Sequence, residues 1–221
     1  HNTLSFNWFF RQNFIRMDYH VIREIGGFDN QPELWKPYLK EWSSLLNPNP
    51  FYKNTLFLVE EGWRAISGNR VIGLDYLKRG APVFRFKSGK AGKGIKLSYS
   101  RSIEKGTVRA GGSLTEAINW AYLLGWKRIV LVGIDLYDRR YFWLKSDETR
   151  SNDRMRNASH TDRHNMANST VSVLERWGKE MAAEGVRLEC YNPKSLLADV
   201  LPLYTRSSAP TNPLNKVLFR S

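Results

Sequence analysis

The sequence predicts an α/β protein, a single domain over residues 1–221 built on a doubly wound, mostly parallel sheet. Strand-like and helix-like segments alternate through the C-terminal half, which is typical of parallel sheets. The run Ile129–Ile134 is apolar without alternation, as expected of a strand buried on both faces. With 221 residues, the chain is long enough to bury a full core as one domain.

The N-terminal half is expected to supply four short strands and one helix. Each strand is rich in β-branched or aromatic residues, and Asn7 lies inside the first of them, where a buried amide needs polar partners or a ligand. The expected strands are Leu4–Phe10, Asp18–Ile22, Thr55–Glu60 and Pro82–Phe86, and the expected helix is Glu33–Leu46.

A loop rich in glycine and lysine, Lys87–Lys96, follows the fourth strand. It invites comparison with a phosphate-binding loop of the Walker type. No Ser or Thr follows its Gly-Lys pair, however, and the glycine spacing does not fit. We therefore expect a basic surface loop.

The segment Thr107–Tyr137 organises the rest of the chain. Gly111 and Gly112 predict a turn, and Ser113 with Glu116 fits a capping box at the start of a helix. Gly125 is placed to end that helix. Its expected apolar face consists of Leu114, Ala117, Ile118, Ala121 and Leu124.

This segment also carries the strongest functional signal in the residues themselves. Asp135 and Tyr137 follow the apolar strand directly, and ligands of open α/β sheets bind at the carboxyl ends of the strands. The N-terminus of the helix behind Gly111 and Gly112 offers backbone amides to a phosphate. An ordinary α/β unit, whose glycines only make a tight turn, explains the same pattern.

Residues 138–168 are rich in charge and poor in aliphatic side chains, so we expect a small polar lid or a disordered insertion there. A helix over Ser169–Glu184 and a strand over Val186–Cys190 should follow. Asn192 and Pro193 then open a short helix over Lys194–Leu201. Residues 204–221 are expected to form an irregular tail.

His160 and His164 stand four residues apart in the polar segment. On a helix that spacing places both rings on one face, as a metal site could use, but no third ligand is evident. A surface role is the second reading. The third is a single catalytic histidine that accepts a proton near neutral pH.

The net charge of the chain indicates which classes of partner it could bind. Against 21 Asp and Glu there are 34 Lys and Arg, a net charge of +13, which predicts attraction to nucleotide phosphates, acidic glycans, anionic lipid or nucleic acid. A single cysteine favours a reducing compartment, and no apolar run reaches the length of a membrane span. We expect a soluble, cytoplasmic protein.

Several motifs occur in the order found in one enzyme family. They are RAGGS at Arg109–Ser113, AYLLGWKRIVLVGIDLY, Tyr141 with Phe142, SHTDRH at Ser159–His164, and RLECYNPKSLLAD at Arg187–Asp199. Together they resemble the bacterial sialyltransferases of glycosyltransferase family 42. The resemblance covers about the C-terminal half, roughly Thr107–Leu203. Asn7, in SFN, also looks like an asparagine that this family uses near the nucleotide sugar.

The resemblance implies a Rossmann-like domain with a lid and an inverting, metal-independent transfer of sialic acid or a related nonulosonic acid from a CMP-sugar. It implies no cofactor. His164 would match the general base, and Tyr137 and Tyr141 the two tyrosines that bind the departing phosphate. The residues that would contact the donor are Asn7, Arg109, Gly111, Gly112, Ser113, Asp135, Asn192 and Ser195.

The family's partners would be a CMP-sugar donor and a glycan or glycolipid acceptor, as in lipopolysaccharide biosynthesis, with peripheral contact to the anionic inner face of the membrane. The glycine-rich segment that precedes the asparagine in the family has no counterpart here. Either that strand lies outside this sequence or the N-terminus is rebuilt. Thr161 also stands where some members carry a lid tyrosine. The donor sugar, the linkage and homo-oligomerisation stay open.

Two other functions remain in view. A pterin pyrophosphokinase-like enzyme shares the GGS…LLG…LVGIDLY pattern, and it would use ATP and Mg²⁺ held by carboxylates such as Asp135. A basic nucleic-acid-binding module would bind DNA or RNA in a salt-sensitive way, although the familiar motifs for that function are missing from the sequence.

Overall fold

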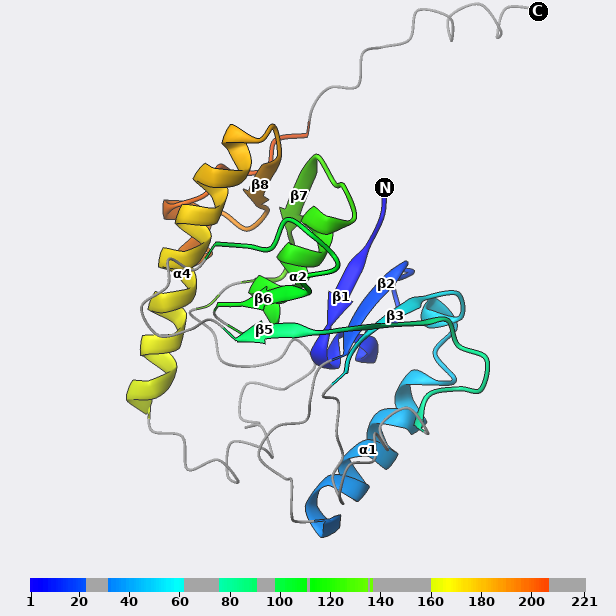
Figure 1. The fold of residues 1–221 in the computed structure, drawn as a ribbon. Coiled ribbons are helices and arrows are strands. Elements are labelled where there is room, and N and C mark those ends of the chain that lie inside the picture. Colours follow the sequence, from blue (N-terminus) through cyan, green and yellow to red (C-terminus); the bar gives the residue numbers. More distant parts are fainter. Residues whose placement is uncertain are drawn as a thin grey trace, which may run out of the picture.

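A computed structural model of the chain describes residues 1–22, 32–61, 76–90, 98–110, 112–134, 136 and 160–206. Within these ranges only the backbone is described at 32–36, 38, 90 and 160–168. The protein is a mixed α/β structure with a four-stranded parallel sheet and three α-helices among the described residues (Figure 1).

Every strand pair that the structure describes is parallel. One sheet has the order β1 (Leu4–Phe6), β2 (Tyr19–Ile22), β3 (Leu56–Glu60), β4 (Val83–Phe86). Two further pairs join β5 (Ser88–Lys90) to β6 (Thr107–Arg109) and β7 (Arg128–Leu131) to β8 (Arg187–Cys190). The helices are α1 (Pro32–Leu46), α2 (Ser113–Leu123) and α4 (His160–Ala183), with 3-10 turns η1 (Asn7–Arg11), η2 (Pro50–Tyr52) and η4 (Leu196–Asp199).

Side chains alternate strictly across the four-stranded sheet, so each face receives a different helix. Phe57 and Val59 pack with Leu39 and Trp42 of α1 on one face. Leu58, together with Val21 and Phe86, packs with Ala117 and Trp120 of α2 on the other. The sheet is therefore covered on both faces, as its near-continuous apolar strands require.

The largest core joins α2 and α4 to β7 and β8. Trp177, Leu174 and Met181 of α4 are fully buried there, beside Ile129 and Leu131 of β7 and Leu188 of β8. Phe6 of β1 packs against this core and also against the smaller one under α2. Figure 1 shows α4 and α1 on opposite sides of the strands.

Most predicted elements are confirmed, with ends that shift by a few residues. The four expected strands, the helix after residue 32, and the α2, β7 and β8 elements are all present. Gly125, with φ of +79°, ends α2 as expected. The short helix after Pro193 is a 3-10 turn over Leu196–Asp199.

Four predictions are wrong in part. Asn7 does not lie within a strand: β1 ends at Phe6, and Asn7 begins η1 with φ of +55°. Ser88–Lys90 is a strand that pairs with β6, so the glycine and lysine loop is shorter than expected. Residues 160–168, assigned to the lid, are helical, since α4 begins at His160. Val132 is 64% exposed, so the strand around β7 is not buried on both faces along its whole expected length.

The start of the predicted irregular tail is also ordered against β8. The backbone N–H of Tyr204 donates to Cys190 O at 2.8 Å, and Leu203 forms a parallel bridge with Cys190. Arg128 lies over the Tyr204 ring and donates to Thr205 O at 2.7 Å. Residues 207–221, like residues 138–159 of the expected lid, lie outside the described residues.

Candidate functional site

The first residue of α2 meets the residue that follows β1. Ser113 Oγ donates to Asn7 Oδ1 at 3.0 Å, although the two residues lie 106 positions apart in the chain. Asn7 adopts the left-handed backbone region, which asparagine enters more easily than most residues and which turns the chain out of the strand. Two positions that the sequence assigned to donor binding are thus joined at the carboxyl end of β1.

Thr115 links the residue after β6 to the N-cap residue of α2. Its hydroxyl accepts from the backbone N–H of Ala110 at 3.2 Å and donates to Gly112 O at 2.9 Å. Gly112 has φ of +99° and ψ of −164°, a region that essentially only glycine occupies. Arg109, half-buried, is the last residue of β6, so the loop leads directly from this guanidinium to the helix N-terminus.

Polar side chains of α2 bind β6 and the segment before it. Glu116 is fully buried, and its Oε1 accepts from the equally buried Thr107 Oγ1 at 2.9 Å. Asn119, also fully buried, accepts from the backbone N–H groups of Val108 and Ser100 and donates to Ser100 O, at 2.8–3.0 Å. These contacts fix β6 against α2.

The predicted capping box is wrong, because Glu116 binds β6 and does not cap the helix. Gly112 is the N-cap, Ser113 is already helical, and Glu116 is used in the interface with β6. The sequence did contain a signal for this interface. Glu116 and Asn119 are polar residues spaced three apart on a helix whose neighbouring positions are apolar, so both face a packed surface.

The carboxyl ends of β7 and β8 are tied together. Ser195 is almost fully buried, and its hydroxyl donates to Ile134 O at 2.6 Å and accepts from the N–H of Leu197 at 3.1 Å. Asn192 Oδ1 accepts from the N–H of Lys194 at 3.0 Å. Both predicted donor-binding residues therefore also shape the turn after β8.

Backbone strain marks the end of the β7 segment. Leu136 has φ of +64°, which is unfavourable for a residue with a branched side chain and recurs at functional sites. Its two neighbours in the chain are Asp135 and Tyr137. These two residues, together with Gly111 and Tyr141, lie outside the described residues.

His164 is described by its backbone, in the second turn of α4. Because α4 leads into β8 through Glu184 and Val186, its C-terminus lies at the amino edge of the strands and its N-terminus toward the carboxyl edge. Figure 1 shows the first half of α4 projecting beyond β7 and β8 on the side where β1 ends. His164 thus lies in the part of α4 that extends toward the edge where Asn7 and Ser113 meet.

A hollow in the described part of the chain lies elsewhere. A pocket of about 550 Å³ opens between the C-terminal ends of α2 and α4 and the loop Arg101–Glu104. Its lining includes Lys127, just before β7, and Val186, just before β8, so it is at the amino edge. Asn7 and Ser113, by contrast, meet at the opposite edge, where β1 ends.

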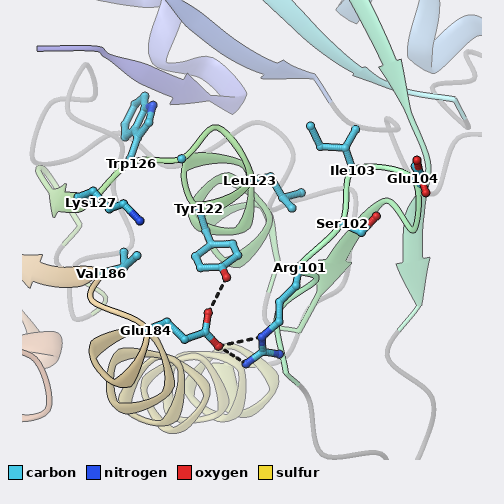
Figure 2. Close-up of a pocket in the computed structure, with 11 residues that line it drawn as sticks. Arg101, Ser102, Ile103, Glu104, Tyr122, Leu123, Trp126, Lys127, Glu184 and Val186 are labelled. Carbon is cyan, nitrogen blue, oxygen red and sulfur yellow. Dashed lines mark hydrogen bonds and ion pairs between the residues drawn. The ribbon is translucent and has the colours of Figure 1, made fainter.

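An ion-pair cluster occupies one wall of this pocket. Figure 2 shows Tyr122 and Arg101 pointing toward the carboxylate of Glu184. The Tyr122 hydroxyl donates to one carboxylate oxygen at 2.5 Å, and Arg101 donates twice to the other, at 2.6 and 2.8 Å. The hydrogen bonds from Tyr122 and Arg101 lower the pKa of Glu184, and the bond to Glu184 raises the pKa of Tyr122. Because this carboxylate is already engaged by both neighbours, we read the cluster as an anchor for the end of α4.

Among the described residues, no three of His, Cys, Asp and Glu are grouped so that they could hold a metal ion. In the same part of the chain, the helices are too short or too polar to cross a membrane. We compared the chain with models of protein families, with curated proteins and with solved structures, and none of the three comparisons gave a match. Membership of a family therefore stays a prediction from the motifs.

Proposed function

We propose that the protein is an inverting, metal-independent glycosyltransferase that moves sialic acid or a related nonulosonic acid from a CMP-sugar to a glycan hydroxyl. The observation that carries the proposal is the hydrogen bond from Ser113 to Asn7. It brings an amide and a hydroxyl to the N-terminus of an 11-residue helix, beside the end of a parallel strand. Such an N-terminus attracts phosphate oxygens.

The order of the strands supports a Rossmann-like arrangement with the site at its switch point. In the four-stranded sheet, the strands lie in the order in which they occur in the sequence, from β1 to β4. Helix α2 comes later in the sequence and contacts both β1 and β7. Phe6 of β1 also packs against the core that contains β7 and β8. In a Rossmann-like arrangement, β7 would follow β1 on the side away from β2, and the order of the strands would reverse between β1 and β7. Ligands of doubly wound sheets bind at that point, and Asn7 leaves β1 there.

Six of the predicted residues have roles that fit their chemistry. Arg109 and the N-terminus of α2 would bind the phosphate of CMP, with Ser113 and Asn7 as polar contacts. Tyr137 and Tyr141 would donate hydroxyl protons to the phosphate as it leaves, which stabilises its charge without a cation. His164 would take the proton from the acceptor hydroxyl, a step that contributes about a hundredfold or more.

The order of bond changes explains why these groups suffice. The bond between the sugar and CMP breaks early, so the sugar becomes positively charged before the acceptor bonds to it. The electron pair of the broken bond goes to the CMP phosphate, and the acceptor proton goes to His164. Stabilisation of the departing phosphate is therefore worth more than a strong nucleophile.

The decisive experiment titrates the protein with CMP and with ATP, with and without EDTA, and follows CMP release from a CMP-sugar. We expect CMP to bind in EDTA and turnover to survive it. ATP turnover that EDTA abolishes would instead favour the pterin pyrophosphokinase-like alternative. Tight, salt-sensitive binding of DNA with no nucleotide binding would favour the nucleic-acid module.

Variants then test the assigned roles. His164→Ala should remove most transfer and leave the affinity for CMP near that of the wild type. Tyr137→Phe and Tyr141→Phe should each lower turnover, and the double variant should lose less than the sum of the two effects if both rings bind one phosphate. Undiminished transfer by His164→Ala would remove the histidine from the mechanism.

A further inference from the structure

A second group of cations surrounds a hollow beside the edge strand β4. The hollow has a volume of about 360 Å³, and its lining includes Lys78, Arg79 and Arg85. The apolar part of the lining consists of Leu77, Ala81 and Val83. We refer to this feature as the basic hollow. All three of its cations are exposed.

The turn that carries Lys78 and Arg79 is closed by a backbone hydrogen bond. The backbone N–H of Ala81 donates to Lys78 O at 3.0 Å, and Gly80 has φ of +82°, the value expected at the third position of a type II turn. Arg79 is therefore held at the second position of a closed turn.

Ser43 of α1 and Asn47, the residue after the end of α1, hold this turn from outside. Asn47 Oδ1 accepts from the backbone N–H of Lys78 at 3.0 Å, and Asn47 Nδ2 donates to Tyr76 O at 2.9 Å. Ser43 Oγ donates to the same carbonyl at 2.8 Å. A side chain of α1 and one from the residue that follows it thus hold the entrance to the basic turn, and a preorganised site loses less conformational entropy when it binds.

No ion pair joins Lys78, Arg79 or Arg85 to any residue that the structure describes. The sequence between Asp75 and Glu104 is strongly basic: residues 76–103 contain eight Lys and Arg and no Asp or Glu. Elsewhere Arg11, Arg101 and Arg128 each bind a carboxylate. Within the described part of the chain, these three cations are therefore available to a ligand.

We propose that the basic hollow binds a phosphate group of an anionic ligand, independently of the nucleotide site. Guanidinium groups match phosphate oxygens in geometry as well as in charge. A role in solubility alone explains charge on an edge strand, but it does not require a turn fixed by three side-chain hydrogen bonds. The hollow adjoins the amino end of β4, whereas Asn7 and Ser113 lie at the carboxyl end of β1 and the start of α2.

The test measures binding of inorganic pyrophosphate by calorimetry to the wild type and to the triple variant K78Q/R79Q/R85Q. The matched control is K105Q/K127Q/R187Q, which removes three exposed cations outside the hollow and gives the same net charge of +10 (13 minus 3). We expect saturable binding that is about tenfold weaker in the hollow variant, since exposed charge contacts each contribute modestly. The control should bind as the wild type does.

Asn47→Ala distinguishes binding that depends on the conformation of the turn from non-specific electrostatic attraction. The substitution leaves the net charge unchanged but removes the hydrogen bonds that hold the turn. It should weaken pyrophosphate binding several-fold, with folding checked by circular dichroism. Equal weakening by the two triple variants, or no saturable binding, would overturn the proposal. CMP binding should be the same in all these variants, so the result is independent of the proposed transferase function.

A second arm identifies the source of the phosphate group. Sedimentation with phosphatidylcholine vesicles is compared with and without phosphatidic acid, for the wild type and both triple variants. Binding that needs phosphatidic acid and is lost only in K78Q/R79Q/R85Q assigns the hollow to a lipid headgroup. Pyrophosphate binding without vesicle binding assigns it to a soluble phosphate.

Discussion

Ser113 donates its hydroxyl proton to the amide oxygen of Asn7 across 3.0 Å, and so joins the first residue of α2 to the residue that ends β1. Asn7 is exposed and Ser113 is half-buried. We expect Ser113→Ala to weaken CMP binding about three- to tenfold, the contribution of one hydrogen bond, with little change in melting temperature. Ser44→Ala, which removes an exposed helical serine bonded to Glu41 O, is the control and should leave CMP binding unchanged.

We expect replacement of Gly112 to be unfavourable because of its backbone conformation. Steric contact is not the reason, because a methyl group there would meet nothing within 4 Å. Its φ of +99° with ψ of −164° makes Gly112→Ala destabilising by about 1–3 kcal/mol. The strain should also move the helix N-terminus and weaken CMP binding. Gly125→Ala, at another open position of positive φ, should lower stability in urea titration without any effect on CMP.

Asn119 should be the most sensitive polar residue of α2. Asn119 is fully buried, and Asn119→Ala would leave Ser100 N, Ser100 O and Val108 N without their partner. We expect a loss of about 3 kcal/mol in the free energy of unfolding. Asn47→Ala removes three comparable bonds at a half-buried position and should lose less, because water can replace the amide there. Equal losses would contradict the proposed role of burial.

His20 makes the stability depend on pH. Burial lowers its pKa from 6.5 to about 3, in a site where Ser5 Oγ lies 2.8 Å from Nδ1. Between pH 6.5 and 3 the unfolded chain therefore binds the proton and the folded chain does not, so stability falls as the pH falls, by about 1.4 kcal/mol per unit. From pH 6.5 to 5 the wild type should lose about 2 kcal/mol more than His20→Gln in urea titrations. Parallel curves for the two proteins would contradict this.

The sequence predicted those parts of the fold that depend on local pattern. Apolar runs predicted the strands, and glycine after an amphipathic stretch predicted the end of α2 at Gly125. The start of α4 was missed because the composition around His160 is polar, as in a lid, whereas helix formation depends on backbone bonding and tolerates a polar segment. Composition therefore predicts whether a segment is buried or exposed better than it predicts whether the segment is a helix or a loop.

The contacts of the site depended on tertiary structure. The sequence indicated both Asn7 and Ser113 by resemblance, but no local pattern contains a bond between residues 106 positions apart. Glu116 fitted a capping box as well as a buried contact. The position of Thr107 decided between the two, since its hydroxyl is fully buried against the carboxylate. The spacing of residues within one segment does not predict which residues of two distant segments will pair.

Phe6 packs against residues that are synthesised more than a hundred positions after it. When the first 90 residues have left the ribosome, α1 can already cover one face of the nascent sheet, while Val21 and Leu58 on the other face still lack Ala117 and Trp120. A chain arrested at that length would present an uncovered apolar surface to chaperones. The first strand thus completes its packing only after translation has passed α2, so the order of synthesis and the order of assembly differ.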